Sequence, residues 1–297
     1  MKYDYYKYQA LGNDYIVIDP QQTDWQLTPA NIRRLCDRHF GIGSDGILWG
    51  PFFDAAGHIH LRILNPDGSE AERSGNGIGD FVGYLFDAGY VRERAFSLET
   101  ISGTVQVEYL DEAAHTICVD MGIVTFKSQA IPTTFAAAEA LRQPLRVNGK
   151  LYEVSCAAVG NPHCVMPLER VSRELAEEIG PWVEKAVAFP HKINVQLLQV
   201  LDRQNIRIEI WERGAGYTLA SGTSSCAAAA VACRLGLVDM EIDVHMPGGI
   251  IHILIDSDWR LHMTGAVRAV GMGTLARDLR AEISSPVLAP DKDMAFR

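Results

Sequence analysis

Two short loops in this chain carry the residues best suited to chemistry. The first, Ser74-Gly75-Asn76-Gly77, follows a strand-like run at 61–64 and opens an apolar helical run at 78–85. A helix that begins in this way leaves backbone N–H groups and the positive end of its dipole at the loop, where an anion can bind. Because many helices begin after Ser-Gly without binding a ligand, this loop alone is weak evidence of a site.

A second copy of the pattern strengthens this interpretation. Ser221-Gly222-Thr223 follows a strand-like run at 206–210 and opens a helical run at 226–233. Each helix is expected to stop at a glycine, Gly89 in the first copy and Gly236 in the second, 15 residues after the serine. The sequence therefore predicts two equivalent helix starts.

The two helix starts belong to an internal repeat with an offset of about 147 residues. A strand expected at 8–19 carries Gly12-Asn13-Asp14-Tyr15, and one expected at 152–166 carries Gly160-Asn161-Pro162-His163. Hairpins are predicted after the helices, within 95–121 and 241–263.

The repeat predicts an α/β (α+β) fold of two pseudo-symmetric domains. Each domain should be a sheet curled around a central helix, because a helix that is apolar on most faces must be enclosed. The expected divisions are a first domain at 1–124, a junction at 125–149 with an Ala-rich helical insert at 133–142, a second domain at 150–277, and a tail at 278–297 that is loose from Ser284 onward.

Equivalent positions of two such domains should meet in a cleft. One carboxylate would then receive the backbone N–H groups of Gly75, Asn76, Gly222 and Thr223. Ser74 and Ser221 would flank the carbon that bears this carboxylate, one on each face. This arrangement suits removal of a proton from one face and its return to the other, which is racemisation or epimerisation at a Cα.

Composition excludes several other classes of function. The 297 residues are 47% hydrophobic with a net charge of −10, which is typical of a soluble globular protein and not of a nucleic-acid binder. No apolar run approaches the roughly 18 residues of a membrane span, and the first residues lack a signal peptide's apolar core. We therefore expect a cytoplasmic protein without a membrane partner.

Neither a metal nor an organic cofactor is expected. The six cysteines form no Cys-x-x-Cys pair and are interpreted as reduced thiols. Cys36 and His39 could share a metal, but a plain helix face is the simpler interpretation. The Ser-Gly loops lack the full Gly-x-Gly-x-x-Gly fingerprint, so a dinucleotide site is not expected.

The chain resembles the diaminopimelate epimerases, within the cofactor-independent amino-acid racemases that include proline racemase. The resemblance covers nearly the whole chain. It rests on Gly12-Asn13-Asp14-Tyr15, Asn65-Pro66-Asp67-Gly68-Ser69-Glu70, Ser74-Gly75-Asn76-Gly77, Gly160-Asn161-Pro162-His163, Asn194 and Glu212-Arg213-Gly214-Ala215-Gly216. It implies two mirrored α/β domains, a PLP-independent isomerase of lysine biosynthesis, an amino-acid substrate and a homodimer.

The resemblance also implies roles for individual residues. Five of them would bind the non-reacting end of diaminopimelate, with the arginine taking its carboxylate: Asn13, Asn65, Asn161, Asn194 and Arg213. Glu212 would help to hold the substrate ammonium, and His163 would lie near the reacting centre. With Ser74 and Ser221, these two complete the candidate catalytic set.

The sequence departs from the family at the two catalytic positions. The family uses one cysteine thiolate as base and one thiol as acid, whereas this chain has Ser74 and Ser221. A hydroxyl is far harder to ionise than a thiol with its pKa near 8.5, so two serines alone are poor proton-transfer groups. Further departures are Gly79, Asp80 and Tyr217, at positions where the family usually has arginine, cysteine and glutamate.

Three explanations remain open at this point. The cysteines were replaced deliberately to trap a substrate complex, or the chain is a natural branch that uses another base such as His163, or it binds substrate without turnover. The function hypotheses are correspondingly a diaminopimelate epimerase (LL- to meso-) or a close relative on another amino acid, a related isomerase or lyase, and a non-catalytic amino-acid binder.

Overall fold

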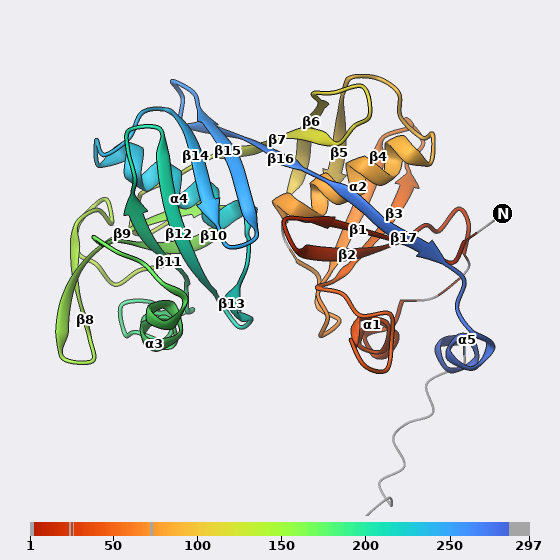
Figure 1. Cartoon of the computed structure of the whole chain (residues 1–297), viewed down its shortest axis with the longest axis horizontal. Coiled ribbons are helices and arrows are strands. Elements are labelled where there is room, and N and C mark those ends of the chain that lie inside the picture. Colours follow the sequence, from red (N-terminus) through yellow and green to blue (C-terminus); the bar gives the residue numbers. More distant parts are fainter. Residues whose placement is uncertain (1–2, 24, 26, 72–73, 285–297) are drawn as a thin grey trace, which may run out of the picture.

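Two long helices, α2 (Gly75–Asp87) and α4 (Gly222–Arg234), each lie inside a curled sheet, and the two units stand side by side (Figure 1). The computed structural model describes residues 3–23, 25, 27–71 and 74–284. In α2 every residue from Gly75 to Leu85 is buried, and in α4 every residue from Gly222 to Ala232. This confirms the predicted mixed α/β class.

The strands around α2 alternate between parallel and antiparallel partners. They are β1 (Tyr5–Ala10), β2 (Asn13–Ile18), β3 (Ile47–Phe53), β4 (Ile59–Leu64), β5 (Ala95–Thr100), β6 (Gly103–Tyr109) and β7 (Thr116–Ile123). β2 runs parallel to β3 and β4 parallel to β5, while the other sequential neighbours are antiparallel.

The strands around α4 repeat this pattern of pairing. They are β9 (Lys150–Val159), β10 (Asn161–Pro167), β11 (Asn194–Val200), β12 (Asn205–Glu212), β14 (Glu241–Met246), β15 (Gly249–Ile255) and β16 (Arg260–Ala266). Here β10 runs parallel to β11 and β12 parallel to β14, with antiparallel pairs elsewhere. The internal repeat in the sequence is therefore a repeat of strand order and direction.

Two pairings connect the halves of the chain. β7 of the first half pairs antiparallel with β16 of the second, from Thr116 opposite Ala266 to Ile123 opposite Arg260. The chain then returns to the first half, where β17 (Arg268–Gly273) pairs antiparallel with β1 (Figure 1). The expected second domain at 150–277 thus contains two strands, β16 and β17, that pair with strands of the first half.

The single strands expected at 8–19 and 152–166 are each two strands. Leu11 and Gly12, with φ of 56° and 86°, form the turn between β1 and β2, and Gly160, with φ of 78°, separates β9 from β10. Gly12 and Gly160 occupy the left-handed region that glycine adopts most readily. Each turn places an asparagine, Asn13 or Asn161, at the start of the returning strand.

The helical insert expected at 133–142 was wrong, because this segment is an irregular loop with one β-bridge, between Glu139 and Lys127. The backbone N–H of Ser128 donates to Ala138 O at 3.0 Å, and that of Ala140 donates to Phe126 O at 2.9 Å. On its other side, the N–H of Cys156 donates to Ala140 O at 2.7 Å. These backbone hydrogen bonds to neighbouring segments of the same chain outweigh the helix propensity of the alanines.

The remaining elements are three helices and two short strands. Of the strands, β8 (Gln143–Val147) pairs with β9 and β13 (Gly216–Thr218) pairs with β12. The helices are α1 (Pro29–Cys36), α3 (Arg173–Glu184) and α5 (Arg277–Ser284). The start of the expected tail is therefore helical, and it packs on α1, where Asn31 Nδ2 donates to Ile283 O at 2.8 Å. The part expected to be loose, from 285 onward, lies outside the described residues.

Two smaller expectations concern thiols and membranes. No disulfide joins the six cysteines, and Cys36 ends α1 so that His39 lies beyond the helix. None of the described helices is both long enough and apolar enough to span a bilayer.

Candidate active site

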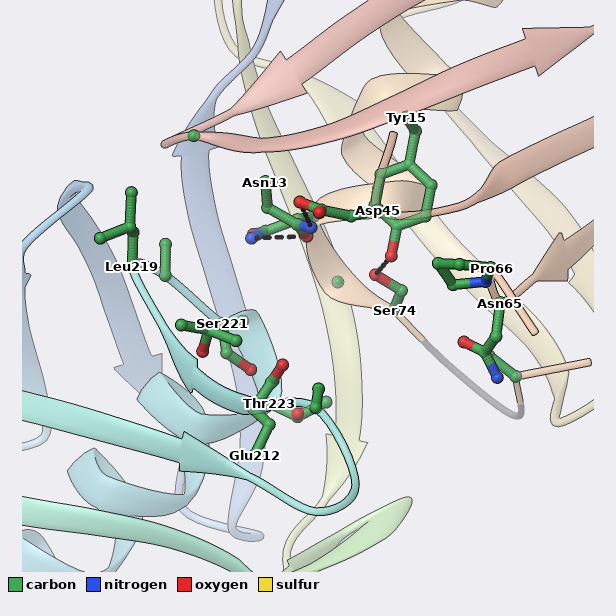
Figure 2. A pocket seen from close by; sticks show the side chains of 18 of the residues that line it. Asn13, Tyr15, Asp45, Asn65, Pro66, Ser74, Glu212, Leu219, Ser221 and Thr223 are labelled. Atoms are coloured by element: carbon green, nitrogen blue, oxygen red, sulfur yellow. Dashed lines mark hydrogen bonds between the residues drawn. The ribbon is translucent and has the colours of Figure 1, made fainter. Parts of the chain in front are cut away.

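A cavity of about 480 Å³ lies where the two helix starts meet (Figure 2). Both halves of the chain line it. The lining includes ten of the residues expected from the sequence: Asn13, Asn65, Ser74, Gly75, Asn76, Asn161, Glu212, Ser221, Gly222 and Thr223. The cleft predicted from pseudo-symmetry is therefore present in the structure.

The two serines cap the helices that they precede. Ser74 Oγ accepts the N–H of Gly77 at 3.1 Å, and Ser221 Oγ accepts the N–H of Ser224 at 3.5 Å. Each serine hydroxyl therefore accepts the N–H of the third residue of its helix. The first two N–H groups of α2 and α4 are the ones that a helix start leaves for a ligand.

Glycine allows the two helix starts to approach one another. A Cβ atom on Gly222 would stand 3.3 Å from Gly75 Cα and 2.7 Å from Met263 Sδ. A larger residue at this position would push the helices apart. The close approach brings two positive dipole ends to one cavity, which favours a bound carboxylate.

Each serine has a second ionisable group beside it. Tyr15 Oη lies 3.0 Å from Ser74 Oγ, and Glu212 lines the cavity near Ser221, whose side chain affects the pKa of the Glu212 carboxyl group. Figure 2 shows Tyr15 with Ser74 on one side of the cavity and Glu212 with Ser221 on the other. The two sides therefore differ chemically, although their backbones are related by the repeat.

The surroundings raise the pKa of both groups. Burial raises the pKa of Glu212 above its usual value, and the charge of Asp45 adds to this effect. Burial also raises the pKa of Tyr15, and the negative charge of Glu212 acts in the same direction. Glu212 is the better base of the two groups, and Tyr15 is protonated in the resting site.

A polar network on the first half supports the cavity wall. Asn13 Nδ2 donates to Asp45 Oδ2 at 2.9 Å, and Asn76 Nδ2 donates to Asn13 Oδ1 at 3.3 Å. Arg38 Nη2 donates to both Asp14 and Asp45 at 2.6 Å. These bonds fix the amide of Asn13 at the cavity.

His163 does not reach the cavity in this structure. It is fully buried on β10, and its Nε2 lies 2.7 Å from Oδ1 of Asn161, which does line the cavity. Burial lowers the pKa of His163 to about 3, although the nearby side chain of Gln196 opposes the shift. At neutral pH this imidazole is uncharged and orients Asn161.

Arg213 and Asn194 also lie away from the cavity wall. Asn194 is buried, donates through Nδ2 to Pro162 O at 2.9 Å, and accepts the backbone N–H of Arg213 at 2.9 Å. The side chain of Arg213 is exposed, with Nη1 3.4 Å from His191 O. Asn194 therefore ties the start of β10 to the turn between β12 and β13.

The lining includes polar residues to which the sequence analysis gave no role, among them Tyr15, Arg38 and Asp45. Tyr15 stands in the Gly-Asn-Asp-Tyr motif, but a tyrosine in a strand is usually a packing residue. Tyr217 replaces the glutamate usual in the family, and its Oη donates to Glu209 at 2.6 Å. Among the described residues, no group of three His, Cys, Asp or Glu side chains is placed to hold a metal.

Comparison with known proteins decides the family. The model for diaminopimelate epimerase matches residues 5–127 and 155–270. Diaminopimelate epimerase 2 of Nostoc sp. is 48% identical over 277 residues, covering 93% of this chain and 97% of that protein. The chain belongs to the diaminopimelate epimerase family. The diaminopimelate epimerase of Synechocystis sp. is 38% identical over 277 residues, covering 92% and 99%.

Solved structures outside the diaminopimelate epimerases share the fold. A hydroxyproline epimerase from Agrobacterium vitis has a TM-score of 0.67 at 14% identity, with 93% of this chain and 92% of that chain covered. A probable proline racemase from Agrobacterium radiobacter has a TM-score of 0.65 at 13% identity, with 92% and 93% covered. At these identities the similarity establishes the two-lobed architecture.

Proposed function

We propose that this chain is a cofactor-independent epimerase that inverts the Cα of diaminopimelate between its LL and meso forms. The observation that carries the proposal is the pair of serine-capped helix starts at one cavity, with an ionisable group beside each serine. Membership of the diaminopimelate epimerase family supports the substrate.

Binding of the reacting end follows from the helix starts. The substrate α-carboxylate would accept the N–H groups of Gly75, Asn76, Gly222 and Thr223, where both helix dipoles favour negative charge. The same contacts would stabilise the charge that develops when the α-proton leaves. Glu212 would accept a hydrogen bond from the α-ammonium before it takes part in proton transfer.

Binding of the far end would use the asparagines and Arg213. Asn13, Asn65 and Asn161 line the cavity and offer amide donors and acceptors to a second ammonium and carboxylate. Arg213 would turn from its exposed position to form a bidentate contact with the far carboxylate, as guanidinium groups commonly do. Asn194 would hold the turn that carries Arg213 in place, and His163 would hold the side chain of Asn161 in place.

Proton transfer would use the two serines as relays. On one face, Ser221 would take the α-proton while passing its own to Glu212, whose raised pKa makes it a stronger base than an ordinary carboxylate. On the other face, Ser74 would return a proton to the Cα. The serines thereby act without forming a free alkoxide.

The test is proton NMR of LL-diaminopimelate with the protein in D₂O. We expect loss of the α-proton signal and appearance of meso product. The double variant Ser74→Cys, Ser221→Cys should exchange faster by about tenfold to a thousandfold, because a thiol at a helix start ionises far more readily than a hydroxyl. Ser225→Cys, in the same helix but outside the cavity, should match the original rate.

Other outcomes would replace the proposal. No exchange by the chain with both serines, together with exchange by the double cysteine variant, would identify a binder that retains the epimerase scaffold without turnover. A product that is not a stereoisomer would indicate an isomerase or lyase. Absence of exchange from both would exclude diaminopimelate as the substrate.

The proposal extends to assembly and location. By resemblance to the family, the chain would act as a homodimer in the cytoplasm, and light scattering should give twice the chain mass of 32.7 kDa. A mass equal to one chain at micromolar concentration would contradict the proposed homodimer but not the proposed reaction.

A further inference from the structure

The hydroxyl of Tyr15 has one hydrogen-bond partner among the described residues, the hydroxyl of Ser74. Tyr15 Oη lies 3.0 Å from Ser74 Oγ, which also accepts the Gly77 N–H at 3.1 Å. The ring stands on β2 in the cavity wall and is 8% exposed (Figure 2). Because an N–H already occupies one lone pair of Ser74 Oγ, the hydroxyl can accept from Tyr15 while donating its own hydrogen into the cavity.

The groups around Tyr15 keep its hydroxyl protonated. Burial raises its pKa, the hydrogen bond with Ser74 acts in the opposite direction, and three carboxyl groups raise the pKa further: Glu212, Asp45 and Asp80. Tyr15 is therefore protonated in the resting site and can donate a hydrogen bond to Ser74 across the working pH range. It passes its proton on only as Ser74 gives up its own, because a serine alkoxide is a stronger base than a tyrosinate. At the opposite serine the neighbouring ionisable group among the described residues is the carboxyl group of Glu212, which accepts a proton instead of donating one when it is ionised.

We propose that Tyr15 is a positioning residue that makes Ser74 the proton-donating face of the site, while Ser221 with Glu212 forms the proton-accepting face. This inference rests on the proposed function. It assigns different roles to two positions that the backbone repeat makes equivalent.

The proton transfers balance in the following way. The Cα–H bond breaks on the Ser221 face as the proton moves to Ser221 Oγ and the serine proton moves to Glu212. On the other face a new Cα–H bond forms with the proton of Ser74, and the proton of Tyr15 Oη moves to Ser74 Oγ. The enzyme is left with protonated Glu212 and a tyrosinate, and proton exchange with water restores both groups.

The first experiment compares LL- and meso-diaminopimelate in D₂O with Tyr15→Phe. Inversion should fall at least about tenfold from both diastereomers. The diastereomer whose Cα–H faces Ser221 should still gain deuterium without inversion, because only its reprotonation from the Ser74 face is lost. The other should lose exchange as well. A purely structural role of Tyr15 would lower exchange equally from both, and that result would overturn the inference.

Tyr8→Phe is the matched control. Tyr8 is a buried tyrosine on the neighbouring strand β1, and its Oη donates to Asp87 at 2.6 Å, away from the cavity. This variant loses an equally buried phenol hydroxyl, so it should retain both exchange and inversion. The same loss pattern in Tyr8→Phe and Tyr15→Phe would contradict a specific role for Tyr15.

A second experiment tests Tyr15 without any substrate. The thiol introduced by Ser74→Cys is alkylated with iodoacetamide across a pH series, and the modified peptide is followed by mass spectrometry. Adding Tyr15→Phe should slow alkylation near pH 7 by about tenfold, because the thiolate loses a hydrogen-bond donor. Adding Tyr8→Phe should leave the rate unchanged. Identical rates with and without Tyr15 would overturn the inference even if diaminopimelate is not the substrate.

Discussion

Asp80 is a carboxyl group in the core of the first lobe. Its side chain is fully buried in α2, and neither oxygen has a hydrogen-bond partner among the described residues. Burial raises its pKa well above the ordinary 3.8, and the charge of Asp14 adds to the shift. A cysteine, which the resemblance to the family implies at this position, would be penalised far less by burial.

The pH dependence of stability should therefore carry a contribution from Asp80. Between pH 3.8 and its raised pKa, the folded chain holds a proton that the unfolded chain has released. Stability thus falls as pH rises through this window, by about 1.4 kcal/mol per pH unit. Asp80→Asn should raise the urea midpoint at pH 7, and the gain should vanish as the pH falls to about 4.

Asp37→Asn is a control of opposite sign. The carboxylate of Asp37 is exposed and accepts the backbone N–H groups of Phe40 and His39, which lower its pKa. This variant should therefore be less stable than the original at pH 7, with a deficit that shrinks in acid. A gain for Asp80→Asn that did not change with pH would show that titration is not its cause.

Local sequence signals predicted some site residues and missed others for a physical reason. Ser74 and Ser221 could be identified because a helix cap is a local pattern of small polar residues before an apolar run. The place of Tyr15 beside Ser74 depends on how β2 packs against α2, a contact between residues 59 apart in the chain. His163 was expected near the reacting centre, but the structure buries it behind Asn161.

At the scale of elements, the approach of α2 to α4 depends on Gly222. Gly222→Ala should destabilise the fold by about 1–3 kcal/mol, as overpacking of a core commonly does. The Sδ of Met263 can shift, but the backbone of Gly75 cannot move without moving α2. Urea unfolding monitored by circular dichroism would measure the effect.

Gly271→Ala provides the comparison for that measurement. Gly271 lies in β17, and a Cβ atom there would meet nothing within 4 Å. The urea midpoint of the Gly271→Ala variant should therefore stay close to that of the unsubstituted protein. Equal stability of the Gly222→Ala and Gly271→Ala variants would show that the helix starts tolerate separation.

The elements themselves were predictable where their signals are local. The two core helices, their glycine stops and the hairpins after them follow from periodicity and turn residues, and the structure places Gly89 and Gly236 at φ of 79° and 74°. The segment 133–142 was misassigned because its alanines favour a helix only when nothing else pairs with the backbone. Here Phe126, Ser128 and Cys156 supply those partners.

At the scale of the whole molecule, the two halves share hydrogen-bonded strands. β16 pairs with β15 in its own half and with β7 in the other, and Met263 on β16 contacts both helix starts. Sequence periodicity could identify the repeat, but it could not show which strands cross between its copies. That choice depends on which strand edges meet after each half has formed.

The shared strands predict that the two halves unfold together. Hydrogen exchange of the peptides for α2 and α4, measured against urea, should give one midpoint for both helices. Two separate midpoints in the natural chain would contradict this coupling. Thr264→Pro should then separate the midpoints, because Thr264 lies between Cys118 of β7 and His252 of β15 and proline removes a ladder donor.

Val270→Pro is the control for Thr264→Pro. It tests whether the effect depends on where the proline lies or on the general disruption that proline causes in a strand. Val270 is 58% exposed on β17, at the point where the register with β1 skips between Lys7 and Tyr8. Proline is tolerated at such a bulge, so this variant should retain a single midpoint. Because β17 joins only β1 of the first half, even a local weakening there would leave the β7–β16 connection between the halves intact.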